Sequence, residues 1–265
     1  MNDPRALFDT YLRQRRELGE RFVVLERNRE RPAPAEPERP RSAPATGGRR
    51  AGWRKDAPPV PPPGMAVPLP AEDLFTADPL RGADLETIAA LVRACRKCQL
   101  CQGRTNAVPG EGPAEAKLVV VGEGPGARED ETGRPFVGRA GELLTEILAA
   151  IEVPRERVFI CNIVKCRPPG NRRPQQDEID ACAPYLYAQL ARIRPTVILA
   201  MGGTAAETML STKQSLASLR NRVHSFRGTP LVVTYHPAAL LRNPHWKKPT
   251  WDDVRIARQL LDARA

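Results

Sequence analysis

The chain has 265 residues and carries 41 Lys and Arg against 31 Asp and Glu, a formal charge of +10 at pH 7. This excess suggests a polyanionic partner, with nucleic acid as the first candidate. The N-terminus is too charged for a secretory signal, and no apolar run approaches the roughly 20 residues that cross a membrane. We therefore expect a cytoplasmic protein whose six cysteines are thiols or metal ligands rather than disulfides.

The first 83 residues divide into two predicted segments. Residues 1–30 have the pattern of a charged amphipathic helix, whose role the sequence does not indicate. Residues 31–83 contain a long stretch of Pro, Ala, Arg and Gly with almost no aliphatic pattern. Such a stretch cannot bury a core, so we interpret it as a disordered, partly extended linker.

Residues 84–265 alternate between helices and short apolar runs. A helix from Asp84 leads into "CRKCQLC", and later helices are predicted within 138–151, 174–193, 203–210 and 251–263. The apolar runs "KLVVVG", "RVFICNIV", "TVILAMG" and "PLVVTYHP" lie between them. Continuous apolar strands that alternate with helices predict a three-layer α/β/α domain with a central four-stranded parallel sheet. In such sheets ligands bind at the carboxyl ends of the strands.

Four of the cysteines have the spacing of a metal site. Cys95 and Cys98 form a CxxC pair, and Cys166 and Cys182 can be brought to it by the fold. Four thiolates suit either zinc or a [4Fe-4S] cluster, and spacing does not choose between them. Cys101 competes with Cys98 as a ligand, whereas Cys161 lies on an apolar strand and is expected in the core.

The turn "GEGPG" at residues 122–126 is not a phosphate-binding loop. Glu129, Asp130 and Glu131 follow it and would repel an anion, whereas a dinucleotide fingerprint leads directly into a helix. A carboxylate after this turn fits chemistry in which a water is oriented or positive charge develops. For Asp130 and Glu131 we expect only a charged surface loop.

Two further strand ends carry polar groups suited to a base. The amide of Asn162 presents a donor and an acceptor side by side, a pattern that distinguishes uracil from cytosine. The imidazole of His236 can donate to a developing oxyanion, and the apolar residues that follow it can enter a base stack.

Together these motifs resemble the iron-sulfur uracil-DNA glycosylases, family 4 of their superfamily. The resemblance covers about Leu91 to Leu261 and rests on "GEGPGAREDETGRPFVGRAGELL", "NIVKCRPPGNRRP", "EIDACAPYL" and "TYHPAALLRNP". It implies a [4Fe-4S] cluster on Cys95, Cys98, Cys166 and Cys182. It also implies that "GEGPG" and "HPAALLR" are the active-site motifs.

The resemblance implies excision of uracil from DNA in base excision repair. Uracil would lie at Gly122, Glu123 and Gly124, with Phe136 stacked on the base, Asn162 reading its edge and His236 stabilising negative charge. Gly124 stands where other branches carry Asp or Asn, so water activation would pass to Glu123 or, as second choice, Glu129. Leu240, Leu241 and Arg242 would fill the vacated space in the duplex. The expected phosphate contacts are Arg167, Arg172, Arg173, Lys247 and Lys248.

Other functions remain open at this level. The substrate could be another deaminated base, such as hypoxanthine or xanthine, although Asn162 favours uracil. A non-catalytic nucleic-acid-binding or electron-transfer protein would suit the cysteines and the charge, but would leave Asn162, Phe136 and His236 without a role. We expect a monomer that acts on uracil-containing DNA and that can recruit a repair or replication partner through its N-terminal extension.

Overall fold

The computed structural model describes residues 52–69 and 80–264. The helix predicted for residues 1–30 and much of the predicted linker lie outside the described residues. Within the described part, no helix has the length and hydropathy needed to cross a membrane.

The described residues form one six-stranded sheet in the order β1-β5-β6-β4-β2-β3. Neighbouring strands β3, β2, β4 and β6 are all parallel, which confirms the predicted four-stranded core. The sheet is larger than predicted, because β5 pairs antiparallel with β6 and β1 pairs parallel with β5. The strands are β1 (Pro63–Val67), β2 (Leu118–Gly122), β3 (Val158–Asn162), β4 (Val197–Met201), β5 (Val223–Phe226) and β6 (Thr229–Thr234).

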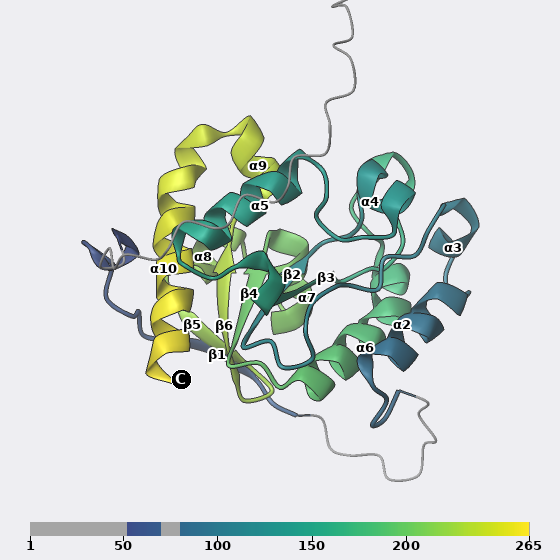
Figure 1. Ribbon diagram of the computed structural model, residues 1–265, viewed down its shortest axis with the longest axis horizontal. Coiled ribbons are helices and arrows are strands. Elements are labelled where there is room, and N and C mark those ends of the chain that lie inside the picture. Colours follow the sequence, from purple (N-terminus) through teal and green to yellow (C-terminus); the bar gives the residue numbers. More distant parts are fainter. Residues whose placement is uncertain (1–51, 70–79, 265) are drawn as a thin grey trace, which may run out of the picture. The chain divides into compact units, whose positions relative to one another are not determined.

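Helices cover both faces of this sheet (Figure 1). Side chains of β2 alternate between two cores: Val119 and Val121 pack with α2, α6 and α7, whereas Leu118 and Val120 pack with α5 and α10. The helices are α2 (Leu85–Ala94), α3 (Leu100–Gly103), α4 (Ala127–Thr132), α5 (Arg139–Ala150), α6 (Gln176–Ile193), α7 (Gly203–Leu210), α8 (Leu216–Leu219), α9 (Pro237–Arg242) and α10 (Lys247–Ala263). Short 3-10 turns are η1 (Gly52–Arg54), η2 (Arg155–Arg157), η3 (Pro169–Asn171) and η4 (Pro244–Trp246).

The central strands are buried on both faces, which explains their continuous apolar sequences. Every residue of β2, β3 and β4 is buried. In the β2–β3 register Gly122 lies beside Asn162, so these two strands end together at one rim of the sheet. The loops after β4 and β6 join the same rim, because those strands run in the same direction.

The prediction of a disordered linker is wrong for residues 52–69. Trp53 is buried, and Arg255 of α10 donates to the carbonyl oxygens of Lys55 and Asp56 (both 3.0 Å). Farther along, β1 pairs with β5, and the Met65 amide donates to Nδ1 of the buried His224 (3.0 Å). Prolines are tolerated in edge strands, where not every backbone amide must join the ladder. The folded domain therefore begins by residue 52 rather than at residue 84.

Candidate active site at the strand ends

A cavity of about 690 Å³ opens at the rim where β2, β3, β4 and β6 end. Its position agrees with the expectation for a parallel sheet. The structure brings together in its walls the side chains predicted for base recognition and chemistry: Glu123, Glu129, Phe136, Asn162, His236 and Arg242.

Asn162 presents an unpaired acceptor at this rim. The residue is 1% exposed, and its Oδ1 has no hydrogen-bond partner among the described residues. A Cβ on the neighbouring Gly122 would lie 2.4 Å from that oxygen and 2.7 Å from Cζ of Phe136, so only glycine fits there. A buried acceptor without a donor costs free energy, which a ligand that donates to it can recover.

Glu129 shapes the loop that carries Phe136. One carboxylate oxygen accepts from the amides of Val137 (2.8 Å) and Gly138 (3.0 Å), and the other accepts from the amide of Gly126 (3.1 Å). Phe136 itself has a φ of 52°, an uncommon value for a bulky residue. Both oxygens of Glu129 are thus engaged by backbone, which suits holding the loop better than activating water.

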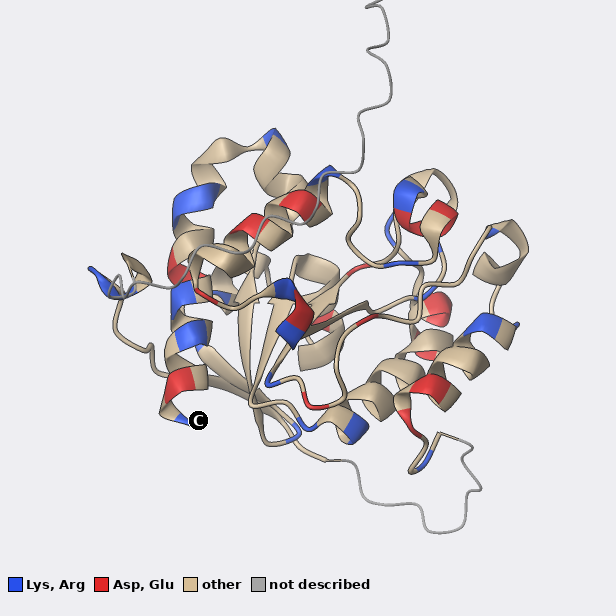
Figure 2. Cartoon of the chain, in the orientation of Figure 1, with Lys and Arg blue, Asp and Glu red and all other residues tan. Residues whose placement is uncertain are grey.

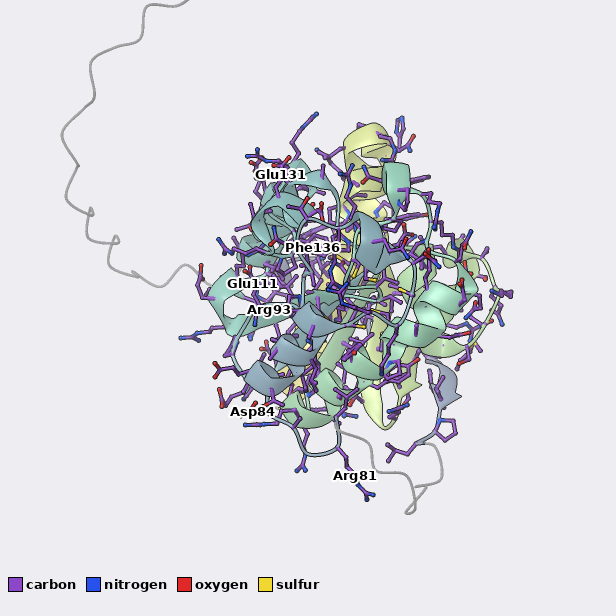
Figure 3. All side chains as sticks on the ribbon, turned by 90° about the vertical axis from the view of Figure 1, so that its right-hand side faces the viewer. Arg81, Asp84, Arg93, Glu111, Glu131 and Phe136 are labelled. Carbon is purple, nitrogen blue, oxygen red and sulfur yellow. The ribbon has the colours of Figure 1, made fainter. Side chains whose placement is uncertain are left out.

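The two acids after Glu129 have different surroundings. Glu131 is exposed, as predicted, and lies at the outside of the molecule in Figure 3, but it belongs to helix α4, which starts directly after the turn, and not to a loop. The same prediction is wrong for Asp130, which is buried on α4 and accepts from the amides of Thr105 (2.9 Å) and Asn106 (3.3 Å). Its carboxylate satisfies two loop donors that burial would otherwise leave unpaired.

Glu123 is the carboxylate best placed for chemistry. Its Oε2 accepts a short hydrogen bond (2.5 Å) from the hydroxyl of Thr204, which lies near the start of α7. No described residue hydrogen-bonds its other oxygen, and the side chain lines the cavity. Thr204 was not predicted, although it follows β4 at the same rim of the sheet.

The hydrogen bond of His236 defines its tautomer. This residue caps α9, and its Nδ1 accepts from the amide of Ala238 (3.2 Å), which leaves the proton on Nε2. Burial lowers the pKa of His236 to about 4, and the nearby Arg242 lowers it further than Glu129 raises it. The ring stacks on Phe136 with centroids 5.4 Å apart. His236 can therefore offer a neutral N–H donor next to an aromatic ring.

The predicted phosphate contacts fall into two groups. Arg172 donates twice to Glu178 (2.9 and 2.6 Å), Arg173 pairs with Glu207, and Arg167 donates to Asn171 (2.8 Å). Arg242 lines the cavity and makes no ion pair with a described residue, and Lys247 and Lys248 are exposed. The second group keeps its charge available to a ligand.

Leu240 and Leu241, both predicted to enter the DNA duplex, differ in exposure. Leu240 is 1% exposed and packs inward from α9, whereas Leu241 is 39% exposed. The expectation that Leu240 enters the base stack is therefore not supported, because withdrawing it would open a hole in the core. Leu241 alone has the exposed apolar surface that such a role requires.

Five cysteines surround a second, smaller cavity. They come from the end of α2, the segment at α3, the loop after β3 and α6: Cys95, Cys98, Cys101, Cys166 and Cys182. Burial raises the pKa of Cys182 to about 12 and also raises that of Cys166, whose sulfur accepts from Arg104 (3.0 Å). No three His, Cys, Asp or Glu side chains of the described residues converge as ligands of a single metal ion. Cys161 is buried in β3, as predicted.

Lys165 links the cysteine cavity to the strand end. Its amide donates to the sulfur of Cys182 (3.2 Å), and its Nζ donates to the carbonyl of Asn162 (2.9 Å) and to Oε1 of Gln189 (2.8 Å). The side chain is buried, so these acceptors replace the water it has lost. The sequence did not predict this role, because a lysine that becomes buried has no local pattern that distinguishes it from the exposed basic residues nearby.

Comparison of the amino-acid sequence with those of known proteins shows the family of this chain. The sequence model described as "Uracil DNA glycosylase superfamily" matches residues 109–257, which include every predicted side chain of the larger cavity. The chain belongs to the uracil-DNA glycosylase superfamily. It is 45% identical over 185 residues to the type-4 uracil-DNA glycosylase of Sulfurisphaera tokodaii, a match that covers 66% of this chain and 84% of that protein.

Two further relatives show that the sequence identity differs between types of the superfamily. The type-4 uracil-DNA glycosylase of Thermotoga maritima is 48% identical over 161 residues, 60% of this chain and 84% of that protein. The type-5 uracil-DNA glycosylase of Thermus thermophilus is 30% identical over 194 residues, 58% of this chain and 86% of that protein. The chain is thus more similar to these type-4 proteins than to the type-5 protein.

Proposed function

We propose that this member of the superfamily excises uracil from DNA by hydrolysing the N-glycosidic bond of deoxyuridine, which leaves an abasic site for base excision repair. The observation that carries the proposal is the unpaired, buried Oδ1 of Asn162 beside Gly122 and Phe136. The activity stated in the names of the type-4 relatives supports it.

Recognition follows from the hydrogen-bonding pattern of the base. Uracil carries a donor at N3 and an acceptor at O4, which complement the carbonyl and the amide hydrogens of Asn162. Cytosine presents an acceptor at N3 and a donor at N4, so it would leave the amide of Asn162 mismatched. A site built around such a hydrogen bond strongly rejects a ligand that cannot make it. Phe136 offers one face of its ring to the flipped base.

The chemistry needs charge stabilisation at both ends of the breaking bond. As the C–N bond breaks, its electron pair moves onto uracil, and the Nε2–H of His236 donates to the oxygen on which negative charge grows. The free oxygen of Glu123 orients the attacking water and accepts its proton, while the other oxygen is held by Thr204. The same carboxylate stabilises the cationic sugar.

Contacts with DNA come from the segment after β6. Leu241 fills the space that the flipped nucleotide leaves, and Arg242, Lys247 and Lys248 approach phosphates. Arg172 and Arg173 contribute less, because Glu178 and Glu207 already offset their charges.

The cysteine cavity fits a [4Fe-4S] cluster held by Cys95, Cys98, Cys166 and Cys182, with Cys101 on the same wall. These cysteines line one shared cavity, and the resemblance to the iron-sulfur glycosylases favours a cluster over a zinc ion. Thiolates in a dry pocket need positive charge nearby, as the raised pKa of Cys182 indicates. Bound there, the cluster supplies a structural cross-link between α2, α6 and the loop after β3. All six cysteines are free, and we place the protein in the reducing cytoplasm.

The decisive experiment measures uracil excision by anaerobically purified protein. The substrate is an end-labelled oligonucleotide with one deoxyuridine, cleaved by alkali at abasic sites, and oligonucleotides with thymine, cytosine, hypoxanthine or xanthine are the controls. We expect cleavage only at uracil, and a loss of about 10²- to 10³-fold in rate for His236→Ala. Protein that shows the absorption of its cluster and leaves deoxyuridine intact would refute the proposal, and full activity of His236→Ala would refute the role of the imidazole.

A further inference from the structure

An aromatic stack stands at the edge of the active-site cavity. Trp246 lies on Tyr235 with ring centroids 4.7 Å apart and an angle of 4° between the planes. The guanidinium of Arg220 lies 4.6 Å from the centroid of the same tyrosine. Trp246 and Arg220 cannot occupy one face, so they cover opposite faces of Tyr235. The result is a stack of three flat groups.

Buried hydrogen bonds of Arg220 hold this stack in place. Arg220 donates to both carboxylate oxygens of the buried Asp253 (2.7 and 3.0 Å) and to the carbonyl of Pro249 (2.8 Å). Asp253 also accepts from the hydroxyl of Thr234 (2.7 Å). The indole of Trp246 is therefore held in place before any ligand arrives, which lowers the entropy cost of stacking on it.

Trp246 is nonetheless 37% exposed, which is unusual for a ring so well supported. The large hydrophobic side chains that are exposed among the described residues are Val60, Leu69, Leu241 and Trp246, and the last two lie in one short segment beside the cavity. A partly exposed aromatic ring that is held in place is a common element of a binding surface.

The segment of the chain around Trp246 is basic. Residues 237–250 contain Arg242, Lys247 and Lys248 and not one acid. Figure 2 shows the same along α9, η4 and the start of α10, where blue occurs without red. A partner that fits this surface has negative charge and a flat apolar face, which is the chemistry of a nucleotide.

We propose that Trp246 is a stacking platform for an unpaired base of single-stranded DNA next to the target nucleotide. In a duplex each base is already covered by its neighbours on both faces, so an aromatic ring finds no free face there. In a single strand a base can leave its neighbours and stack on the indole. The platform thus adds affinity for uracil in single strands, and in this respect it rests on the proposed function.

The first test compares the full-length protein with Trp246→Ala and Trp246→Phe. Steady-state kinetics are measured on one deoxyuridine oligonucleotide, as a single strand and in duplex. Loss of a base–aromatic stack should raise KM for the single strand about 5- to 150-fold with little change in kcat. The duplex KM should change much less, and Trp246→Phe should restore most of the affinity. Equal changes on both substrates, or no change on either, would overturn the proposal.

The second test does not depend on catalysis. Quenching of tryptophan fluorescence is titrated with a single-stranded oligothymidylate that contains no uracil. Trp246→Phe should lose most of the quenching, whereas Trp251→Phe, a matched loss of one indole from α10, should retain it. Unchanged quenching in Trp246→Phe would overturn the proposal. Because this readout needs no excision, it stands even if the chain leaves uracil intact.

Discussion

Glu123 and Glu129 follow the same strand, yet their hydrogen bonds suit them to different tasks. Glu129 accepts three backbone amides and so fixes the loop of Phe136. Glu123 accepts one hydroxyl and keeps an oxygen directed at the cavity. The sequence places both acids near the rim but does not show which of them the backbone will engage.

We expect Glu123→Gln to lower kcat by about 10²-fold or more with little change in KM, because the amide keeps the bond to Thr204 but cannot accept a proton. Glu129→Gln should act differently: an amide NH₂ cannot accept from backbone N–H, so the loop loosens, KM rises and thermal stability falls. Single-turnover kinetics and thermal melts of both variants separate the two roles. The assignment is reversed if Glu129→Gln loses only kcat and Glu123→Gln loses only stability.

The imidazole of His236 should titrate far below the ordinary range. Its pKa of about 4 is depressed from 6.5 by burial and by Arg242. The unfolded chain therefore binds this proton at higher pH than the folded chain, and the free energy of unfolding falls as pH drops from about 6.5 to 4. NMR titration of the ring should show a low midpoint in the parent and a higher one in Arg242→Gln, where a neighbouring positive charge is gone. A parental midpoint near 6.5 would contradict the depression of the pKa by burial and by Arg242.

The residues that could be predicted are those at the ends of apolar strands. Asn162 ends one apolar strand and His236 follows another by two residues, so the topology alone sends them to one rim. Thr204, Lys165 and Trp246 escaped prediction because their roles depend on contacts that only the folded chain makes. Thr204 contacts a residue 81 positions earlier, and no local pattern encodes such a pair.

At the scale of elements, the buried ion pair between Arg220 and Asp253 connects a helix, a strand and the loop after a second helix. Arg220 follows α8, Asp253 lies in α10, and Thr234 ends β6, and all three meet at the carboxylate of Asp253. The pair lies behind the loop that begins with Tyr235 and His236. Its integrity thus supports both the imidazole and the stack that carries Trp246.

Arg220→Met should cost about 3–5 kcal/mol in the free energy of unfolding, because it leaves the carboxylate of Asp253 buried without its cation. Arg54→Met is the matched control: it also removes an arginine–aspartate pair, but Arg54 is 66% exposed and the expected loss is below about 1 kcal/mol. Urea unfolding of both variants measures the difference. Equal losses would show that burial does not set the strength of the Arg220–Asp253 pair.

Strand prediction succeeded where burial on both faces imposed a continuous apolar run. It failed for β5, whose sequence "VHSF" mixes polar and apolar residues because only alternate positions are fully buried. It failed also for β1, where proline suggested a linker. Both strands lie at one side of the sheet, where backbone pairing contributes more to order than side-chain hydrophobicity does.

At the scale of the whole domain, segments from earlier in the chain pair with β5 at one side of the sheet and with β3 at the other. β1 covers β5, and at the opposite edge Glu111 exchanges two backbone hydrogen bonds with Ile160 of β3 (3.0 and 2.8 Å). The family match begins at residue 109 and so leaves β1 outside it.

Gly64→Ala tests whether β1 is essential to the domain. A Cβ at this position would lie 2.6 Å from Nδ1 of His224, so the strand must shift, at a cost of about 1–3 kcal/mol. A Cβ on Gly52 meets nothing within 4 Å, so Gly52→Ala serves as the control and should leave stability nearly unchanged. Thermal melting measures both variants. Equal melting temperatures would mean that β1 contributes little to the stability of the domain.

The pairing of β1 with β5 also bears on how the molecules behave toward one another. An uncovered strand offers its amides and carbonyls to any extended chain, including another copy of the same protein. By supplying β1, the chain covers β5 and moves the open edge of the sheet to a short strand that begins with a proline, which pairs less readily with a further strand. A variant that releases β1 should self-associate at high concentration, through exchange of that strand between neighbouring molecules.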